Sequence, residues 1–67
     1  MDIGSKIKKS RADAKITQEQ AAQALGISRQ TISNWENERS YPDIVSVLKM
    51  SELYSVSLDY LLKGEGP

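Results

Sequence analysis

The chain of 67 residues contains no cysteine and no histidine. Their absence excludes disulfide bonds, thiolate and imidazole metal ligands, cysteine nucleophiles and histidine bases. Long apolar runs are also lacking, since none is longer than a triplet and a membrane-spanning helix needs about 20 apolar residues. The N-terminal residues show no apolar signal-peptide core. We therefore expect a soluble, cytoplasmic protein that uses no metal and no other cofactor.

The chain also has no excess of positive or negative charge. The nine basic and nine acidic side chains cancel, and the pI is about 6.2, whereas a strongly basic domain is the usual footprint of nucleic-acid binding. Residues 1–39 nevertheless carry seven basic and five acidic side chains, and residues 40–67 carry two and four, which leaves the halves at +2 and −2. Such a dipole would orient the chain on a polyanion, and we expect a weaker salt dependence of binding than for a basic domain.

The stretch from Thr17 to Trp35 predicts a short helix that ends in a glycine turn. Thr17 and Gln20 form a capping-box pattern, which starts a helix at Gln18. Gly26 then stands where a left-handed residue ends a helix. The apolar stripe of this helix is formed by Ala21, Ala22 and Leu25.

A second short helix follows the turn. Ser28 is a good N-cap, and Ile32 and Trp35 form the inward face of the helix. The side chains expected to point outward are those of Arg29, Gln30, Ser33 and Asn34. These four side chains are available to contact a binding partner.

The flanking segments predict three more helices. The first runs from Asp2 to about Ala14, with Ile3 and Ile7 on one face, and the fourth starts after Asp43. The apolar spacing of the fourth helix is formed by Ile44, Val47, Leu48, Met50, Ser51 and Tyr54. The fifth helix, capped by Ser57, carries Leu58, Leu61 and Leu62. The chain is thus predicted to be a compact all-α bundle of five helices, with one domain over residues 1–63 and a flexible tail over 64–67.

Three residues weaken the first helix and the turn that follows it. Gly4 costs about 1 kcal/mol relative to alanine inside a helix. Ser10 stands where a third apolar residue would help, and Lys15 stands where a glycine would ease the turn.

A short helix, a glycine turn and a second helix crossing the first form the geometry that places the second helix in the DNA major groove. Ala22 must be small because the second helix passes close to it. Gly26 must take a positive φ, and Ile32 must be apolar to seat the pair on the core. These three requirements at fixed offsets indicate a helix-turn-helix unit.

The segment TQEQAAQALGISRQTISNWENERSYPD resembles the helix-turn-helix of the Cro-like, phage-repressor type known as the XRE family. IKKSRADAKIT resembles the first helix and turn of that family, and LKMSELYSVSLDYLL resembles its fourth and fifth helices. The resemblance implies a lambda-repressor-like bundle that binds a double-stranded DNA operator and regulates transcription as a repressor. It also implies a homodimer on a two-fold symmetric site. The sequence departs from the family at Ser10, where leucine is usual, and at Lys15, where glycine is frequent.

The family's functional positions fall on two sets of residues in this chain. Its base-reading positions correspond to Arg29, Gln30 and Asn34, with Thr31 and Ser33 beside them. Arginine pairs with guanine, and glutamine or asparagine with adenine, at about 1–3 kcal/mol of discrimination for a bidentate pair. Its phosphate contacts correspond to Gln18, Asn37, Arg39 and Ser40. Arg11 and Glu36 resemble a structural ion pair, with an occasional phosphate contact from Arg11.

Two other readings remain open at this point. An antitoxin-like or adaptor module would keep the same fold and present its surface to a protein, which zero net charge favours slightly. An enzyme is disfavoured because Glu36 and Glu38, two apart, do not share a helix face.

If the chain forms the homodimer that the resemblance implies, the expected contact is the last helix and its surroundings, with Val56, Leu58 and Leu61.

Overall fold

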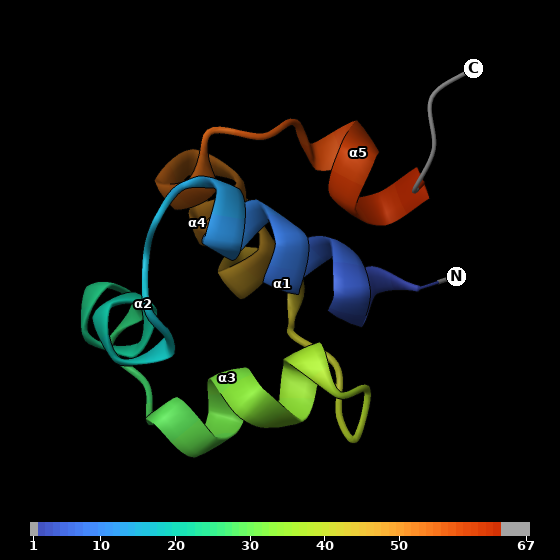
Figure 1. The fold of residues 1–67 in the computed structure, drawn as a ribbon. Coiled ribbons are helices and arrows are strands. Elements are labelled where there is room, and N and C mark those ends of the chain that lie inside the picture. The colour runs from blue at the N-terminus through green and yellow to red at the C-terminus, as the bar shows by residue number, and fades with distance from the viewer. Residues whose placement is uncertain (1, 64–67) are drawn as a thin grey trace.

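Five helices wrap around one core in the computed structural model, which describes residues 2–63 (Figure 1). Their bounds are α1 (Ile3–Asp13), α2 (Gln18–Leu25), α3 (Arg29–Glu36), α4 (Ile44–Tyr54) and α5 (Leu58–Lys63). No strand occurs within residues 2–63. This arrangement confirms the predicted all-α bundle of five helices. The predicted flexible tail, residues 64–67, lies outside the described residues.

The predicted caps form as the sequence indicates. The Thr17 hydroxyl accepts a hydrogen bond from the Gln20 backbone N–H at 3.0 Å, and the Gln20 side chain accepts one from the Thr17 N–H at 2.9 Å. This reciprocal pair is the capping box. Gly26 has φ 72° and ends α2, and the Ser28 hydroxyl accepts from the Thr31 N–H at 3.1 Å to begin α3. Local hydrogen bonds therefore fix both ends of the turn between α2 and α3.

The core draws at least one side chain from each helix. Four large side chains are almost entirely buried, those of Ile7, Ile32, Met50 and Leu61. Trp35 is buried beside Ile32, as predicted for the inward face of α3. Because α3 rests on α1 and α2 through these side chains, its opposite face stays available to solvent (Figure 1).

The burial of the apolar residues in α4 and α5 corrects one prediction. Ile44 and Leu48 of α4 are 64% and 45% exposed, so not every apolar residue of the helical spacing lies in the core. The buried stripe of α4 is formed by Val47, Met50, Ser51 and Tyr54. Residues in a helix advance by about 100° each, so apolar residues at 44 and 48 lie on the neighbouring face. Conversely, Leu61 is 0% exposed, so it lies in the core and not on the surface expected to form a dimer.

Lys15 has φ 62°, in the left-handed region where glycine is favoured. Its backbone N–H donates to the Ala12 carbonyl at 2.9 Å and closes the turn after α1. The prediction that this position would suit a glycine is confirmed.

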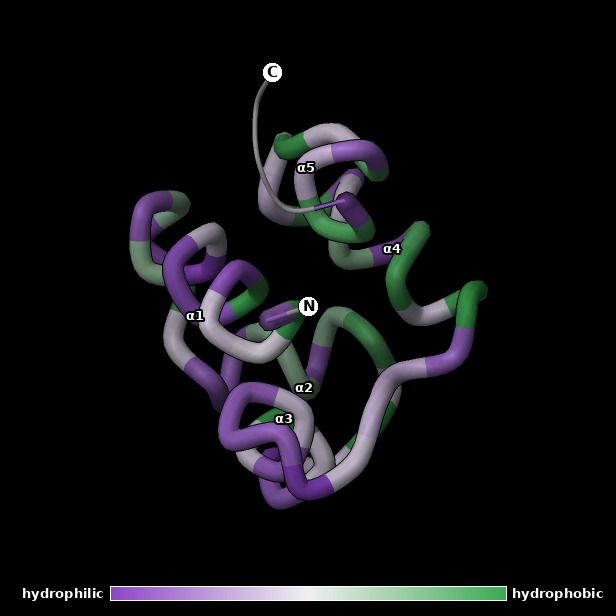
Figure 2. The backbone as a smooth tube through the Cα atoms, turned by 90° about the vertical axis from the view of Figure 1, so that its right-hand side faces the viewer, coloured by the Kyte–Doolittle hydropathy of each residue, from purple (hydrophilic) through white to green (hydrophobic). Residues whose placement is uncertain are grey.

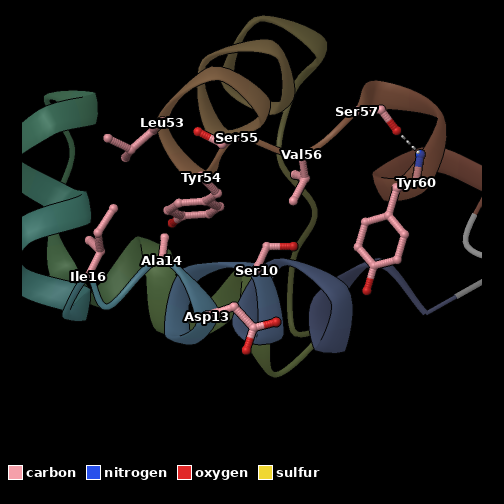
Figure 3. Close-up of a pocket in the computed structure, with 10 residues that line it drawn as sticks. All are labelled: Ser10, Asp13, Ala14, Ile16, Leu53, Tyr54, Ser55, Val56, Ser57 and Tyr60. Atoms are coloured by element: carbon pink, nitrogen blue, oxygen red, sulfur yellow. Dashed lines mark hydrogen bonds between the residues drawn. The ribbon is translucent and has the colours of Figure 1, made fainter.

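A hollow of about 670 Å³ lies between the end of α1 and the turn from α4 to α5 (Figure 3). Ser10 and Tyr54 line it, and both hydroxyl oxygens are buried without a hydrogen-bond partner. Burial raises the pKa of Tyr54 to about 12. Ser10 is only 3% exposed, so the position predicted to suit an apolar residue is a core position.

Ser10→Ala is expected to raise the free energy of unfolding by about 1 kcal/mol, because it removes a buried hydroxyl that has no partner. Alanine is also the better helix former. Urea unfolding followed by circular dichroism measures the change. Ser5→Ala serves as the comparison, because the Ser5 hydroxyl is exposed and donates to Asp2 at 2.6 Å. A loss of stability in Ser10→Ala would contradict the expectation.

Within residues 2–63, no helix combines the length and the apolar character that crossing a membrane requires.

Candidate nucleic-acid interface

The α2–α3 unit has the predicted helix-turn-helix geometry. Ala21 and Ala22 are 0% and 3% exposed, as expected where α3 packs closely against α2. The Ile27 N–H donates to the Ala22 carbonyl at 3.0 Å across the glycine turn. Ile32, on the inward face of α3, packs in the hydrophobic core and holds α3 against it. The structure thus confirms the small residue in the close contact at Ala22, the positive φ at Gly26 and the apolar core contact of Ile32.

The outer face of α3 carries the predicted base-reading side chains. Arg29 and Gln30 are exposed, whereas Thr31, Ser33 and Asn34 are half-buried. The Gln30 amide nitrogen donates to the Asn34 side-chain oxygen at 3.1 Å, one helical turn away. The structure therefore joins Gln30 and Asn34 into a polar row, with Arg29 at the N-terminal end of the helix.

Gln18 connects this face to the interior. Its amide nitrogen donates to a Glu36 oxygen at 3.0 Å, and its amide oxygen accepts from the Arg29 guanidinium at 3.3 Å. The side chain is therefore oriented by Glu36 and in turn holds Arg29. The backbone N–H groups of Gln18 and Glu19, at the start of α2, have no acceptor within the helix and can donate to a phosphate.

Arg11 and Glu36 form the ion pair that the sequence predicts. Arg11 Nε and Nη2 donate to the two Glu36 oxygens at 2.7 and 3.1 Å, with side-chain exposures of 13% and 2%. Arg11 Nη1 donates to the Ile16 carbonyl at 2.8 Å. The hydrogen bond to Glu36 raises the pKa of Arg11. All three guanidinium nitrogens thus already have protein acceptors, so a phosphate contact by Arg11 would have to share them.

The loop after α3 presents the remaining predicted phosphate contacts. Arg39 and Ser40 are exposed, and the Arg39 backbone N–H donates to the Asn34 carbonyl at 2.9 Å. Asn37 is exposed as well, but its amide nitrogen donates to the Ser33 carbonyl at 3.0 Å. These three residues follow directly after the C-terminal end of α3 in the chain.

Glu38 holds this loop in place, a role that the sequence did not reveal. The residue has φ 61°, and a carboxylate oxygen accepts the Gly4 backbone N–H at 2.6 Å. It thereby caps α1 from 34 positions away. A Cβ on Gly4 would lie 2.8 Å from the carbonyl oxygens of Trp35 and Glu36. The only sequence indication was a glycine inside a predicted helix, which marks a close backbone approach as readily as a weakness.

Comparison with known proteins identifies this geometry. A sequence model described as helix-turn-helix matches residues 7–61. The HTH-type transcriptional regulator ImmR of Bacillus subtilis is 44% identical over 62 residues, covering 92% of this chain and 49% of that protein. The HTH-type transcriptional activator BcrR of Enterococcus faecalis is 40% identical over 65 residues, covering 97% of this chain and 32% of that protein. The chain thus spans half or less of the length of these relatives.

The crystal structure of the P22 c2 repressor in complex with a synthetic operator superposes with a TM-score of 0.88. The two are 34% identical, and the match covers 97% of this chain and 98% of that one. The family match, the relatives and the superposition agree with the caps, the glycine turn and the polar outer face of α3. The chain belongs to the helix-turn-helix family of the XRE type.

Proposed function

We propose that this chain binds double-stranded DNA in a sequence-specific manner and regulates transcription, with α3 in the major groove. The observation that supports it most is the superposition, over 97% of the chain, on a repressor that was solved with its operator. An α-helix fits the width of the major groove, and the outer face of α3 carries polar side chains that the core does not use. The direction we propose is repression, because a bound domain excludes other proteins from the site without needing a further surface.

The bases are read by the row on α3. Arg29 donates to O6 and N7 of a guanine, and Gln30 and Asn34 pair with adenine edges. Since Gln30 and Asn34 are hydrogen-bonded to each other, they present their free donors and acceptors as one unit. Thr31 and Ser33 complete the proposed base-reading set.

The phosphates are held on both sides of that row. Gln18 and the first turn of α2 bind one strand, and Asn37, Arg39 and Ser40 bind beyond the end of α3. Phosphate contacts fix the register of a protein on DNA without reading its sequence. A chain with no net charge relies on individual hydrogen bonds and ion pairs to phosphates more than on long-range electrostatic attraction to DNA.

Two copies bind together in this proposal. A helix of eight residues reaches only a few base pairs, so one copy discriminates little among sites. A homodimer on a two-fold symmetric operator reads two half-sites about 10 bp apart, or a multiple of that spacing.

Binding-site selection from random duplexes tests the proposal. A two-fold symmetric consensus is the expected result. If no sequence is enriched, the alternative of a protein-interaction module is favoured, and its binding to a protein partner through an apolar surface would depend little on salt.

Arg29→Ala is expected to lower affinity by about 1–3 kcal/mol for the selected operator and to relax the preference at one base pair. Arg39→Ala should weaken binding to all sequences alike and reduce the salt slope by about 1. Fluorescence anisotropy on the operator and on single-base variants measures both effects. If Arg29→Ala weakens every duplex equally, it does not read a base.

A further inference from the structure

The hollow between the end of α1 and the α4–α5 turn has the size of a small-molecule site. Its volume is about 670 Å³, and ligand pockets in proteins range from about 300 to 1,000 Å³. Its apolar lining is formed by Ala14, Ile16, Leu53 and Val56. Figure 3 shows these side chains and the ring of Tyr60 around the hollow. The hollow is therefore large enough, and apolar enough, to hold the body of a small organic molecule.

The residue at position 10 controls how much of this space is open. Ser10 is a core residue, 3% exposed, and its side chain is much smaller than the leucine that is usual there in the family. In Figure 3 its hydroxyl points from α1 into the space between Val56 and Tyr60. A larger apolar side chain at this position would occupy part of that space. The hollow thus depends on a residue in which this chain departs from its family.

The floor of the hollow carries hydrogen-bonding groups that the protein does not use. Ser10 and Tyr54 line it and are 3% and 4% exposed, and neither hydroxyl oxygen has a hydrogen-bond partner within the described residues. Buried polar groups in proteins are nearly always hydrogen-bonded, because an unpaired one loses its interaction with water and gains nothing. A ligand with a hydrogen-bonding group would satisfy what the protein leaves unpaired.

The electrostatics of the hollow favour a cation. The C-terminal ends of α1 and α4, with their C-caps Ala14 and Ser55, both line it. A helix carries partial negative charge at this end, where its last carbonyl groups have no partner within the helix. Asp13 adds a carboxylate, and none of the ten described residues that line the hollow is a lysine or an arginine. The ring of Tyr60 can also attract a cation through its face.

Lys9 is a weak competitor for the same carboxylate. Its Nζ lies 2.9 Å from an Asp13 oxygen, and the two side chains are 68% and 67% exposed. An exposed ion pair of this kind contributes little, because water screens both charges. An ammonium group in the hollow can therefore share the Asp13 carboxylate with Lys9 or displace it.

We propose that the hollow binds a small organic ammonium ion, a primary amine carried on an aromatic body. Ser10 and Asp13 are three residues apart on α1 and so lie on one face of the helix, where the ammonium group donates to both. The aromatic body lies against Val56 and Tyr60. Because the ligand joins α1 to the α4–α5 turn, it binds the folded chain alone and stabilises it.

The site lies away from the proposed DNA-binding face. Figure 2 shows α3 at one end of the molecule and α5 at the other, with α1 between them, and Figure 1 agrees. A ligand in the hollow leaves the outer face of α3 uncovered, so the chain can hold the ligand and DNA at the same time. The proposal therefore goes beyond the proposed function and does not depend on it.

The test uses three probes of similar shape and different charge: phenethylammonium, phenethyl alcohol and phenylacetate. Each is titrated into the isotope-labelled chain, and NMR follows the backbone amide shifts. The ammonium probe should give saturable shifts at the end of α1 and in the α4–α5 turn, and none in α3. It should bind about fivefold more tightly than the alcohol, because two helix ends and a carboxylate favour its charge. Phenylacetate should bind more weakly than the alcohol.

Three variants locate the binding site. Ser10→Leu fills the hollow and should abolish the saturable shifts. Asp13→Asn, at an exposed position, should weaken the ammonium probe about threefold and leave the alcohol unchanged. Lys9→Gln is the matched control, since it breaks the same ion pair but keeps the carboxylate, and it should bind the ammonium probe at least as tightly as the parent. Urea unfolding adds a second measurement, in which the ammonium probe raises the midpoint of the parent but not of Ser10→Leu.

Several results would overturn the proposal. Equal affinity for phenethylammonium and phenethyl alcohol would refute the preference for a cation. Unchanged binding in a Ser10→Leu variant that is folded by circular dichroism would place the ligand elsewhere. If Ser10→Leu does not fold, Asp13→Asn decides, and an unchanged ammonium affinity in that variant refutes the site. Shifts that do not saturate would show that the hollow binds no such ion. Since no DNA is present, none of these outcomes bears on the proposed DNA binding.

Discussion

Glu36→Ala is expected to lower the free energy of unfolding by about 3–5 kcal/mol, because it leaves a buried guanidinium without its counter-charge. The Glu36 side chain is 2% exposed and accepts hydrogen bonds from Arg11 at 2.7 Å and from Gln18 at 3.0 Å. A chain of 67 residues has a total stability of roughly 3–10 kcal/mol. The variant should therefore lose a large part of its total stability. Urea titration followed by the helical circular dichroism signal measures the loss.

The matched control replaces both partners. Arg11→Met combined with Glu36→Leu removes the two charges together and fills the space with apolar groups of similar length. Such replacements are often neutral or stabilising, so the double variant should recover most of the stability that Glu36→Ala loses. A loss below about 1 kcal/mol in the single variant would show that the ion pair matters little. A double variant less stable than Glu36→Ala would show that the site requires its charges.

The same substitution also bears on DNA reading. Glu36 orients the Gln18 amide, and Gln18 accepts a hydrogen bond from Arg29. The ion pair thus connects the stability of the bundle to the placement of a proposed base-reading residue. The buried carboxylate thus takes part both in the ion pair and in the hydrogen bonds that lead to Arg29.

The helices could be predicted because their boundaries depend on neighbours in sequence. The Thr17 and Gln20 capping box, the left-handed Gly26 and the Ser28 cap each act within three residues, so the pattern alone locates them. The outward face of α3 followed from the same local logic once Ile32 and Trp35 were placed inward. The roles of these side chains toward DNA remain predictions.

Three features of the structure could not be predicted, because they depend on contacts between residues far apart in the sequence. Helical spacing shows that α4 has apolar residues three and four apart, but not which of two adjacent stripes meets the core, so it could not show that Ile44 and Leu48 are exposed. The contact between Glu38 and Gly4 spans 34 positions, and no periodicity indicates it. The orientation of Gln18 depends likewise on Glu36, which lies on another helix.

Gly4→Ala is expected to lower the free energy of unfolding by about 2 kcal/mol, the middle of the range for overpacking. Helix propensity alone predicts the opposite, a gain of about 1 kcal/mol. The structure reverses the sign, because the added Cβ would lie 2.7 Å from Glu38 Cγ and 2.8 Å from the backbone oxygens of Trp35 and Glu36. Those oxygens belong to the end of α3, which cannot move without shifting Trp35 in the core. Urea unfolding measures the change.

Two further variants separate the causes. Lys8→Ala, on an exposed position of α1, should be nearly neutral, since nothing there obstructs a side chain. Glu38→Ala removes the Cγ contact but leaves both carbonyl oxygens in place, so Gly4→Ala should remain destabilising in that background. If Glu38→Ala abolishes the effect, the obstruction is the Glu38 side chain and the α1–α3 backbones have room to separate. If Gly4→Ala stabilises the parent chain, α1 and α3 do not approach as closely as the structure places them.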